Sequence, residues 1–129
     1  MVEKKSSGNY RKYTTTSGKI VIGGKDAEQN EEVVNQASSN EYIVHTVAAG
    51  SPFCNIKADA KKVSEQDLHE TCVFCSKYSR DWKKNKKNVR VNIFIKKDVY
   101  KKGDMKTGTF GVKKSKEIIV KKEDIEKFS

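Results

Sequence analysis

Proline, tryptophan and arginine are scarce in this sequence: its 129 residues include one proline, one tryptophan and three arginines. No apolar run approaches the ~20 residues that cross a membrane as a helix. The N-terminal segment, MVEKKSSGNYRKY, lacks the apolar stretch of a secretory signal peptide. Three cysteines, an odd number, are typical of free thiols in a reducing compartment. These absences argue against a membrane protein and a disulfide-stabilised secreted protein, and they predict a cytoplasmic one.

Acidic residues are scarce outside one segment, and the whole chain is strongly basic. The formal net charge is +10, from 27 lysines and arginines against 17 aspartates and glutamates. Between residues 26 and 70, nine acidic and three basic residues give −6, so the rest of the chain carries +16. Such asymmetry predicts a positive surface that attracts a polyanion; the alternative is a lysine-rich exterior that serves only solubility. Because lysine is a point charge on phosphate whereas arginine reads base edges, the composition favours backbone contacts.

The pattern of apolar residues predicts a single α+β domain, with an antiparallel or mixed sheet packed with two main helices. Residues 1–9 are polar and lack periodicity, so we expect a disordered tail followed by a domain over residues 10–129. One helix is expected over residues 26–37. A longer one is expected from Ser64, with Asp67 at the capping-box position, to Trp82. Apolar alternation and β-branched runs predict strands at residues 10–15, 19–22, 41–47, 89–95 and 116–122, and a further strand from Phe53. The first two are expected to form a hairpin that turns at Ser17-Gly18.

The ten residues IGGKDAEQNE, 22–31, join a predicted strand to the first predicted helix. Gly23 and Gly24 permit a positive φ and a close backbone approach. Asp26 is a favourable N-cap, and a glutamine three residues later is placed to complete a capping box. With Lys25 beside it, this helix N-terminus is suited to phosphate. The alternative is a tight turn before a capped helix, with no ligand.

A second motif, HxxCxxC, lies inside the second predicted helix. The spacing of three places His69, Cys72 and Cys75 on one helix face, and Cys54 could supply a fourth metal ligand. Structural zinc sites usually take such pairs from a turn, and redox CxxC pairs lie at a helix N-terminus. The sequence therefore favours cysteines that pack in the core, with metal or redox chemistry as the alternative. No metal or other cofactor is expected.

His45 lies in the predicted strand EYIVHTV, just before a Gly-Ser-Pro turn. It could donate or accept a hydrogen bond in a ligand groove, or it could be a packed core histidine. No serine, cysteine or acid near it stands in a nucleophile motif, so no hydrolytic triad is predicted. We do not expect an enzyme.

Aromatic residues precede a cluster of lysines at the end of the second predicted helix. Tyr78 and Trp82 lie just before the segment KKNKK, residues 83–87. Aromatic rings beside lysines could stack on the bases of a single-stranded nucleic acid. The favoured alternative is that Trp82 anchors the helix to the sheet.

Four segments, taken in order, resemble the RNA-binding domain of the NFACT family, NFACT-R. They are YRKYTTTSGKIVIGGKDAEQNEEVV, EYIVHTVAAGSPF, HETCVFCSKYSRDW and DVYKKGDMKTGTFGV, and the resemblance extends over residues 10–119. Its most specific part is the block Gly-Gly-Lys-Asp-x-x-Gln-Asn-Glu with the downstream histidine and Gly-Ser-Pro. The matching positions are Gly23, Gly24, Asp26, Gln29, Asn30, Glu31, His45, Gly50, Ser51, Pro52, Tyr78, Ser79, Arg80, Trp82, Val99, Lys101, Gly108 and Phe110.

The chain departs from the family pattern at two places. Cys72 and Cys75 stand where relatives tend to have small residues such as alanine, which supports the packing interpretation of the CxxC. Tyr100 replaces the serine of a frequent Val-Ser-Lys, so any role of that serine is lost. Larger members combine the domain with others that these 129 residues do not contain, and the sequence looks like a stand-alone version.

The resemblance implies an RNA-binding module, because larger family members act in ribosome-associated quality control on the large ribosomal subunit and tRNA. We therefore expect a non-enzymatic module that contacts RNA or ribonucleoprotein mainly through phosphates. The alternative is a protein-interaction module that docks on a ribosomal or other acidic protein. Lysine contacts do not sense the 2′-hydroxyl, so composition does not separate RNA from DNA. The expected contact residues are Gly23, Gly24, Lys25, Asn30, His45, Ser51, Arg80, Lys83, Lys84, Lys86, Lys87 and Lys101.

Overall fold

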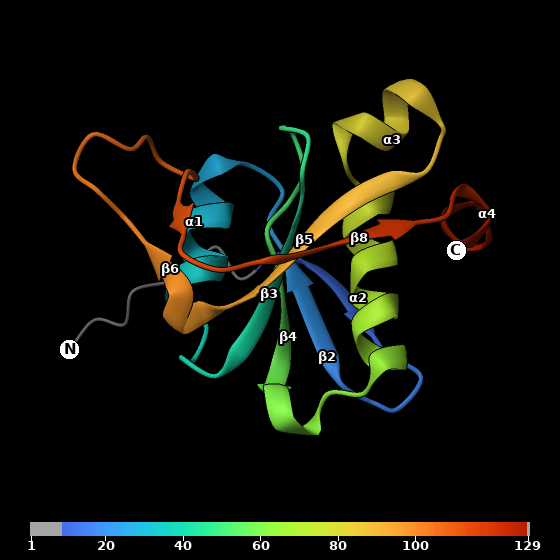
Figure 1. Cartoon of the computed structure of the whole chain (residues 1–129), viewed down its shortest axis with the longest axis horizontal. Coiled ribbons are helices and arrows are strands. Elements are labelled where there is room, and N and C mark those ends of the chain that lie inside the picture. The colour runs from blue at the N-terminus through green and yellow to red at the C-terminus, as the bar shows by residue number, and fades with distance from the viewer. Residues whose placement is uncertain (1–8, 129) are drawn as a thin grey trace.

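A six-stranded, fully antiparallel sheet forms the centre of the molecule, in the order β1-β2-β4-β3-β5-β8 (Figure 1). The structure, a computed structural model, describes residues 9–128. The predicted tail over residues 1–9 lies outside this range except for Asn9. The strands of the sheet are β1 (Arg11–Thr14), β2 (Ile20–Gly23), β3 (Glu41–Thr46), β4 (Cys54–Asp59), β5 (Val89–Ile95) and β8 (Lys116–Val120).

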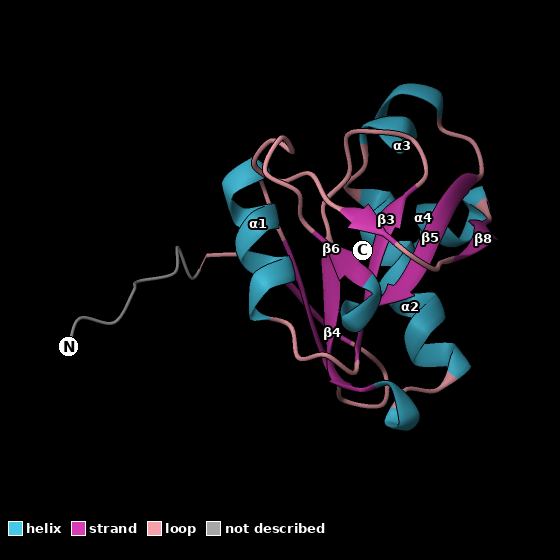
Figure 2. Cartoon of the chain, turned by 60° about the vertical axis from the view of Figure 1, so that its left-hand side comes forward, coloured by secondary structure: helices cyan, strands magenta, loops and turns pink. Residues whose placement is uncertain are grey.

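Helices cover both faces of this sheet, and the predicted α+β class is confirmed (Figure 2). One face carries α1 (Ala27–Gln36), and the other carries α2 (Glu65–Lys77). The remaining elements are α3 (Arg80–Asn85), α4 (Lys122–Lys127), the short 3₁₀ turns η1 (Ala60–Lys62) and η2 (Lys96–Asp98), and a second small sheet of β6 (Val99–Tyr100) and β7 (Gly111–Val112). Among the described residues, no helix is both long and apolar enough to cross a bilayer.

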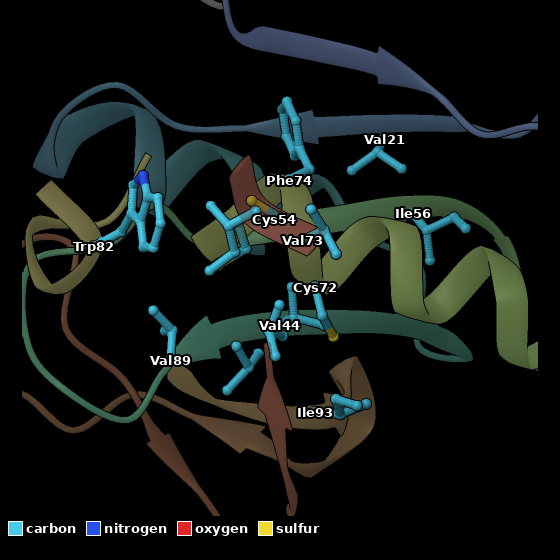
Figure 3. Packing of buried hydrophobic residues seen from close by; sticks show 14 residues of the cluster. Val21, Val44, Cys54, Ile56, Cys72, Val73, Phe74, Trp82, Val89 and Ile93 are labelled. Carbon is cyan, nitrogen blue, oxygen red and sulfur yellow. The ribbon is translucent and has the colours of Figure 1, made fainter. Parts of the chain in front are cut away.

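Two apolar clusters fill the space on either side of the sheet because strand side chains alternate between its faces. In β5, Val91 packs toward α2, whereas Phe94 packs toward α1. Figure 3 shows the α2 cluster, in which Phe74 of that helix lies among side chains of the sheet. Trp82 is 4% exposed and belongs to the same cluster. This burial fits the anchoring interpretation of Trp82 and leaves its ring unable to stack on a base.

The three cysteines are free, fully buried and part of the α2 cluster. Burial raises the pKa of Cys72 and of Cys54 well above the ordinary value of a thiol, which keeps both protonated. His69 does not share their environment, since its side chain is 41% exposed and lies 3.3 Å from Asp124. Within the described residues, no group of three or more His, Cys, Asp or Glu side chains could hold a metal ion. The cysteines are core residues here.

The β1–β2 hairpin is fastened to the N-terminal half of α2 by two buried carboxylates. Asp67 closes the predicted capping box with Ser64 and also accepts a 2.6 Å hydrogen bond from the Ser17 hydroxyl. Hydrogen bonds, first that from Ser17, hold the pKa of Asp67 well below its ordinary value. Glu70 accepts from the Thr16 N–H and from the Tyr13 hydroxyl, both at 2.8 Å.

The hydrogen bonds around Glu70 also shift the pKa values of Glu70 and of Tyr13. For Glu70, burial opposes the charged form, but the hydrogen bonds from Gln66, Thr16 and Tyr13 prevail and lower its pKa. Burial and the bond to Glu70 raise the pKa of Tyr13 to about 12. Asp67 and Glu70 are therefore both ionised at neutral pH, and they connect the hairpin to the helix by charge-assisted hydrogen bonds.

The predicted long helix through Trp82 is wrong, because the chain breaks at Tyr78 and Ser79. The Ser79 hydroxyl donates to the Ser76 carbonyl at 2.7 Å and accepts from the Trp82 N–H at 3.1 Å. A serine that caps the next helix in this way competes with continuation of the first one. The break creates α3 and directs Arg80 away from the α2 axis, toward the turn after β3.

Candidate nucleic-acid interface

An open groove of about 800 Å³ lies at one end of the sheet. Its walls come from the N-terminal end of α1, the turn over residues 47–53, the start of α3 and the loop over residues 107–110. The first three of these segments meet at the upper end of the molecule in Figure 1. Seven of the twelve predicted contact residues line the groove: Gly24, Lys25, Asn30, His45, Ser51, Arg80 and Lys83. The other five, Gly23, Lys84, Lys86, Lys87 and Lys101, do not.

Basic side chains dominate the charge of the groove. Among the described residues, four cationic residues line it, against the single acidic residue Asp26. The cations are Arg11, Lys25, Arg80 and Lys83. Within the described residues, Lys25, Arg80 and Lys83 are exposed and have no ion-pair or hydrogen-bond partner for their charged groups. Unpaired cations that border one concave surface make it attractive to an anion.

Within residues 9–128, Arg11 has fixed partners, unlike the other three groove cations. Its Nη1 donates to the Gly24 carbonyl at 3.1 Å, and its guanidinium lies 4.5 Å from the centre of the Tyr78 ring. These contacts link the edge strand β1 to the glycine turn and to the end of α2. Sequence reasoning did not select Arg11, although it is one of only three arginines in the chain. Its pairing with Tyr78 depends on segments that lie far apart in sequence.

The floor of the groove is the sheet itself. His45 of β3 and Asn92 of β5 are directly opposed partners in the register of these strands, and both line the groove. The His45 ring packs on Phe53 with their centres 4.2 Å apart, and its Nδ1 lies 2.8 Å from the Thr46 carbonyl. His45 therefore lines the groove, and its ring also packs on Phe53, so it combines features of both alternatives that the sequence left open.

The protonation state of His45 follows from these surroundings. Burial lowers its pKa, although the hydrogen bond to Thr46 acts in the opposite direction. A carbonyl oxygen only accepts, so Nδ1 carries the proton and Nε2 of the neutral ring is left as an acceptor. His45 thus presents hydrogen-bonding capacity without charge.

The glycine turn before α1 is used for packing, and few of its N–H groups are free. Gly23 and Gly24 do not adopt positive φ, contrary to one of the uses expected of them. A side chain on Gly24 would collide with Asn30, whose Oδ1 accepts from the Phe53 N–H at 3.0 Å. The Gly24 N–H donates to the Phe53 carbonyl, and the Lys25 N–H donates to Gln29 Oε1.

The predicted capping of α1 is observed in altered form. Asp26 accepts from the Gln29 N–H at 2.8 Å, as expected. The reciprocal bond of Gln29 goes to the N–H of Lys25 at 2.9 Å, one residue before the N-cap. The cationic Lys25 side chain, and not the turn's backbone, is therefore what this junction offers to an anion.

Lys101 organises a loop and is not a free cation at the rim. Its Nζ contacts the carbonyls of Lys106 and Thr109 at 2.6 and 2.7 Å and lies 3.2 Å from Glu31 Oε1. It also lies 4.6 Å from the centre of the Phe110 ring. Together with the Gly108 N–H, which donates to Glu31, these contacts hold the 107–110 loop beside the start of α1.

The lysines after Trp82 divide into two groups. Lys83 lines the groove, whereas Lys84, Lys86 and Lys87 are exposed outside it. Lys86 ends α3 in a left-handed conformation with φ of 51°, and its Nζ lies 4.9 Å from the centre of the Trp82 ring. The four lysines lie within five residues, yet only Lys83 lines the groove.

Comparison with known proteins gives a family and a fold. The family model described as the NFACT protein RNA binding domain matches residues 9–114. An archaeal Rqc2 homolog, aRqcH, from Methanocaldococcus jannaschii is 40% identical over 73 residues, which are 56% of this chain and 11% of that protein. The C-terminal part of the fibronectin/fibrinogen-binding protein from Streptococcus suis has a similar fold, with a TM-score of 0.80 and 20% identity over 98% of this chain and 50% of that one.

Proposed function

Because this chain belongs to the family of NFACT protein RNA binding domains, we propose that it binds RNA through phosphate groups held in the groove. The observation that carries the proposal is the set of three cations, Lys25, Arg80 and Lys83, that border one groove without partners among the described residues. Cations that no carboxylate neutralises are available to an external anion. Their role in this proposal is binding without catalysis.

The proposed contacts differ in kind between the walls of the groove. Lys25 and Lys83 supply flexible point charges, which suit phosphates whose spacing is set by the RNA. Arg80 supplies a planar fork that can hold one phosphate through two hydrogen bonds. Its position is fixed at the backbone, where its N–H donates to the Gly50 carbonyl at 2.8 Å. Gly50, with φ of +95°, has no side chain that would displace the stem of Arg80.

We further propose that the RNA is ribosomal or ribosome-bound, as the NFACT-R resemblance implies, which would make the cytoplasm the site of action. This chain spans about a tenth of the length of aRqcH, and RNA binding is the one step that we propose for it. The proposal concerns the RNA-binding step alone.

The test is a titration of the full chain against a fluorescently labelled single-stranded RNA at several salt concentrations. The logarithm of the association constant should fall linearly with the logarithm of salt, with a slope of about −2 if three phosphates are contacted, at roughly 0.7 per contact. A slope near zero, or no binding at low salt, would overturn the proposal.

A second measurement separates RNA from an acidic protein as the partner. The chain is used to capture partners from a cell extract with and without ribonuclease treatment. Loss of ribosomal proteins after ribonuclease supports binding through RNA. Their retention after complete RNA digestion would replace the proposal by protein docking on the same basic groove.

A further inference from the structure

Two neutral polar side chains lie side by side on the floor of the groove, and phosphate binding does not use them. Asn92 is the cross-strand partner of His45, and opposed residues on one face of an antiparallel pair have their Cβ atoms about 5 Å apart. Within the described residues, the Asn92 amide has no hydrogen-bond partner. Each group is half-buried, so each has given up part of its contact with water.

The hydrogen-bonding pattern of this pair is defined. The contact of Nδ1 with the Thr46 carbonyl leaves His45 Nε2 as an acceptor. The Asn92 amide adds one acceptor oxygen and a donor NH₂ group. Two acceptors with one adjacent donor match a ligand edge that carries an amino group beside a ring nitrogen. Such an edge, with an amino group beside an acceptor ring nitrogen, forms the Watson–Crick side of adenine and of cytosine. Guanine presents a ring N–H there, and uracil lacks the amino group.

The groove has the size and the walls that a base requires. Its volume of about 800 Å³ is within the range of pockets for small organic ligands. Phe110 and Tyr78 line the walls and add apolar surface for a base, while a cation, Lys101 or Arg11, already lies over each ring. The cations Lys25, Arg80 and Lys83 border the same groove, where the phosphates attached to an inserted nucleotide would lie.

We propose that the groove receives one unpaired nucleotide and that His45 and Asn92 recognise the amino-bearing edge of its base, adenine or cytosine. The amide binds the amino group and the ring nitrogen, and Nε2 accepts the second hydrogen of the amino group. This proposal rests on the proposed RNA binding and adds to it a preference for a class of base. Duplex RNA, whose bases are paired, would occupy only the cationic border.

The experiment compares four labelled oligonucleotides of equal length with the full chain: oligoadenylate, oligocytidylate, oligouridylate and an abasic ribose-phosphate chain. Oligoadenylate or oligocytidylate should bind about tenfold more tightly than the other two, as one good bidentate contact discriminates by about 1–3 kcal/mol. If all four bind alike and with a salt dependence, base recognition is wrong while phosphate binding stands. If none binds, RNA binding itself fails.

Two variants test whether His45 and Asn92 cause the preference for adenine or cytosine. Asn92→Leu keeps the volume of the side chain without its hydrogen bonds, and His45→Phe keeps a ring that can pack on Phe53. Each should reduce binding of the preferred oligonucleotide to the level of oligouridylate and leave the abasic chain unchanged. Asn35→Leu, at an exposed position of α1 outside the groove, is the matched control and should change neither.

The variants can also contradict the assignment. Equal weakening of all four oligonucleotides by Asn92→Leu, in a protein whose thermal unfolding is unchanged, would show that the residue supports the groove and does not recognise a base. A preference for adenine or cytosine that survives both variants would likewise overturn the role of this pair.

Discussion

The start of α2 and the groove differ in whether their charged side chains are buried and hydrogen-bonded or exposed and without partners. At α2, Asp67 and Glu70 are 1% and 8% exposed and are bonded to the β1–β2 hairpin. In the groove, Lys25 and Lys83 are exposed and unpaired among the described residues. Buried charges that are fully hydrogen-bonded hold elements together, since removing one partner leaves the others unsatisfied. Exposed charges without partners add little to stability and remain available to a ligand.

The comparison implies that the two regions can be changed independently. A variant at α2 should alter the free energy of unfolding and spare RNA affinity, whereas a groove variant should do the reverse. Both effects are measurable on the same protein, because chemical denaturation reports the first and RNA titration reports the second.

The largest expected effect is that of Asp67→Ala on stability. The substitution removes the capping bond to Ser64, the bond from Ser17 and the 3.3 Å ion pair with Lys19. We expect the free energy of unfolding to fall by about 3 kcal/mol, as is usual when a buried, charge-assisted network loses its anion. Glu65→Ala, an exposed acid in the first turn of the same helix, is the control and should cost less than about 0.5 kcal/mol. Equal losses in both variants would contradict the account of the hairpin junction.

The next effect concerns the groove. Lys25→Glu with Lys83→Glu should weaken single-stranded RNA binding by roughly 25-fold at 0.1 M salt. Each phosphate contact adds ~0.7 logarithmic units to the association constant at 0.1 M relative to 1 M salt, and the variant loses two contacts. The matched control, Lys61→Glu with Lys62→Glu in η1, makes the same change in net charge outside the groove. If the control weakens binding as much, total charge and not the groove determines affinity.

Lowering the pH should have a smaller effect on the free energy of unfolding. Because the pKa of Asp67 is lowered in the folded state, its stabilising contribution is complete above the ordinary carboxylate value near 4 and is lost as the pH falls below it. Between pH 5 and pH 3 this residue should account for about 1 kcal/mol of lost stability. Denaturation of the wild type and of Asp67→Asn at both pH values measures it. An identical pH dependence in the two proteins would assign the acid sensitivity to other groups.

The smallest effect should come from the lysines outside the groove. Lys84→Glu with Lys87→Glu should weaken RNA binding by about twofold at 0.1 M salt, because these lysines do not line the groove and salt screens exposed charges that make no direct phosphate contact. The measurement is the same titration as for the groove variant. A loss as large as that of the groove variant would show that the RNA path continues along α3.

Local sequence signals predicted much of the fold. The hairpin, α1, β5 and the capping box at Ser64 were confirmed, because each depends on residues within one turn or one strand. The predicted helix through Trp82 was wrong because its apolar spacing continues across Ser79, which caps a new helix. The pair β6–β7 and the helix α4 were not predicted. The pair is too short to show periodicity, and α4 follows its strand after a single residue.

The candidate site was predictable only in part. Lys25, His45, Arg80 and Lys83 were selected from the sequence and line the groove. The sequence did not indicate Asn92 as a groove residue, because the role proposed for this asparagine depends on its cross-strand neighbour His45. Arg11 and Phe110 were missed as groove residues for a related reason, whereas Tyr78 was considered as a ring that could stack on bases. Their partners lie in other segments of the chain.

By itself, the sequence determined the excess of positive charge, the kinds of secondary structure and the family to which the chain belongs. Only the tertiary structure decided which cations have partners and which do not. Lys101 and Lys83 are both exposed lysines, yet one is bonded within its loop and the other borders the groove. The physical reason is that ion pairs and hydrogen bonds form over about 3 Å. Folding, not sequence spacing, sets which groups come that close.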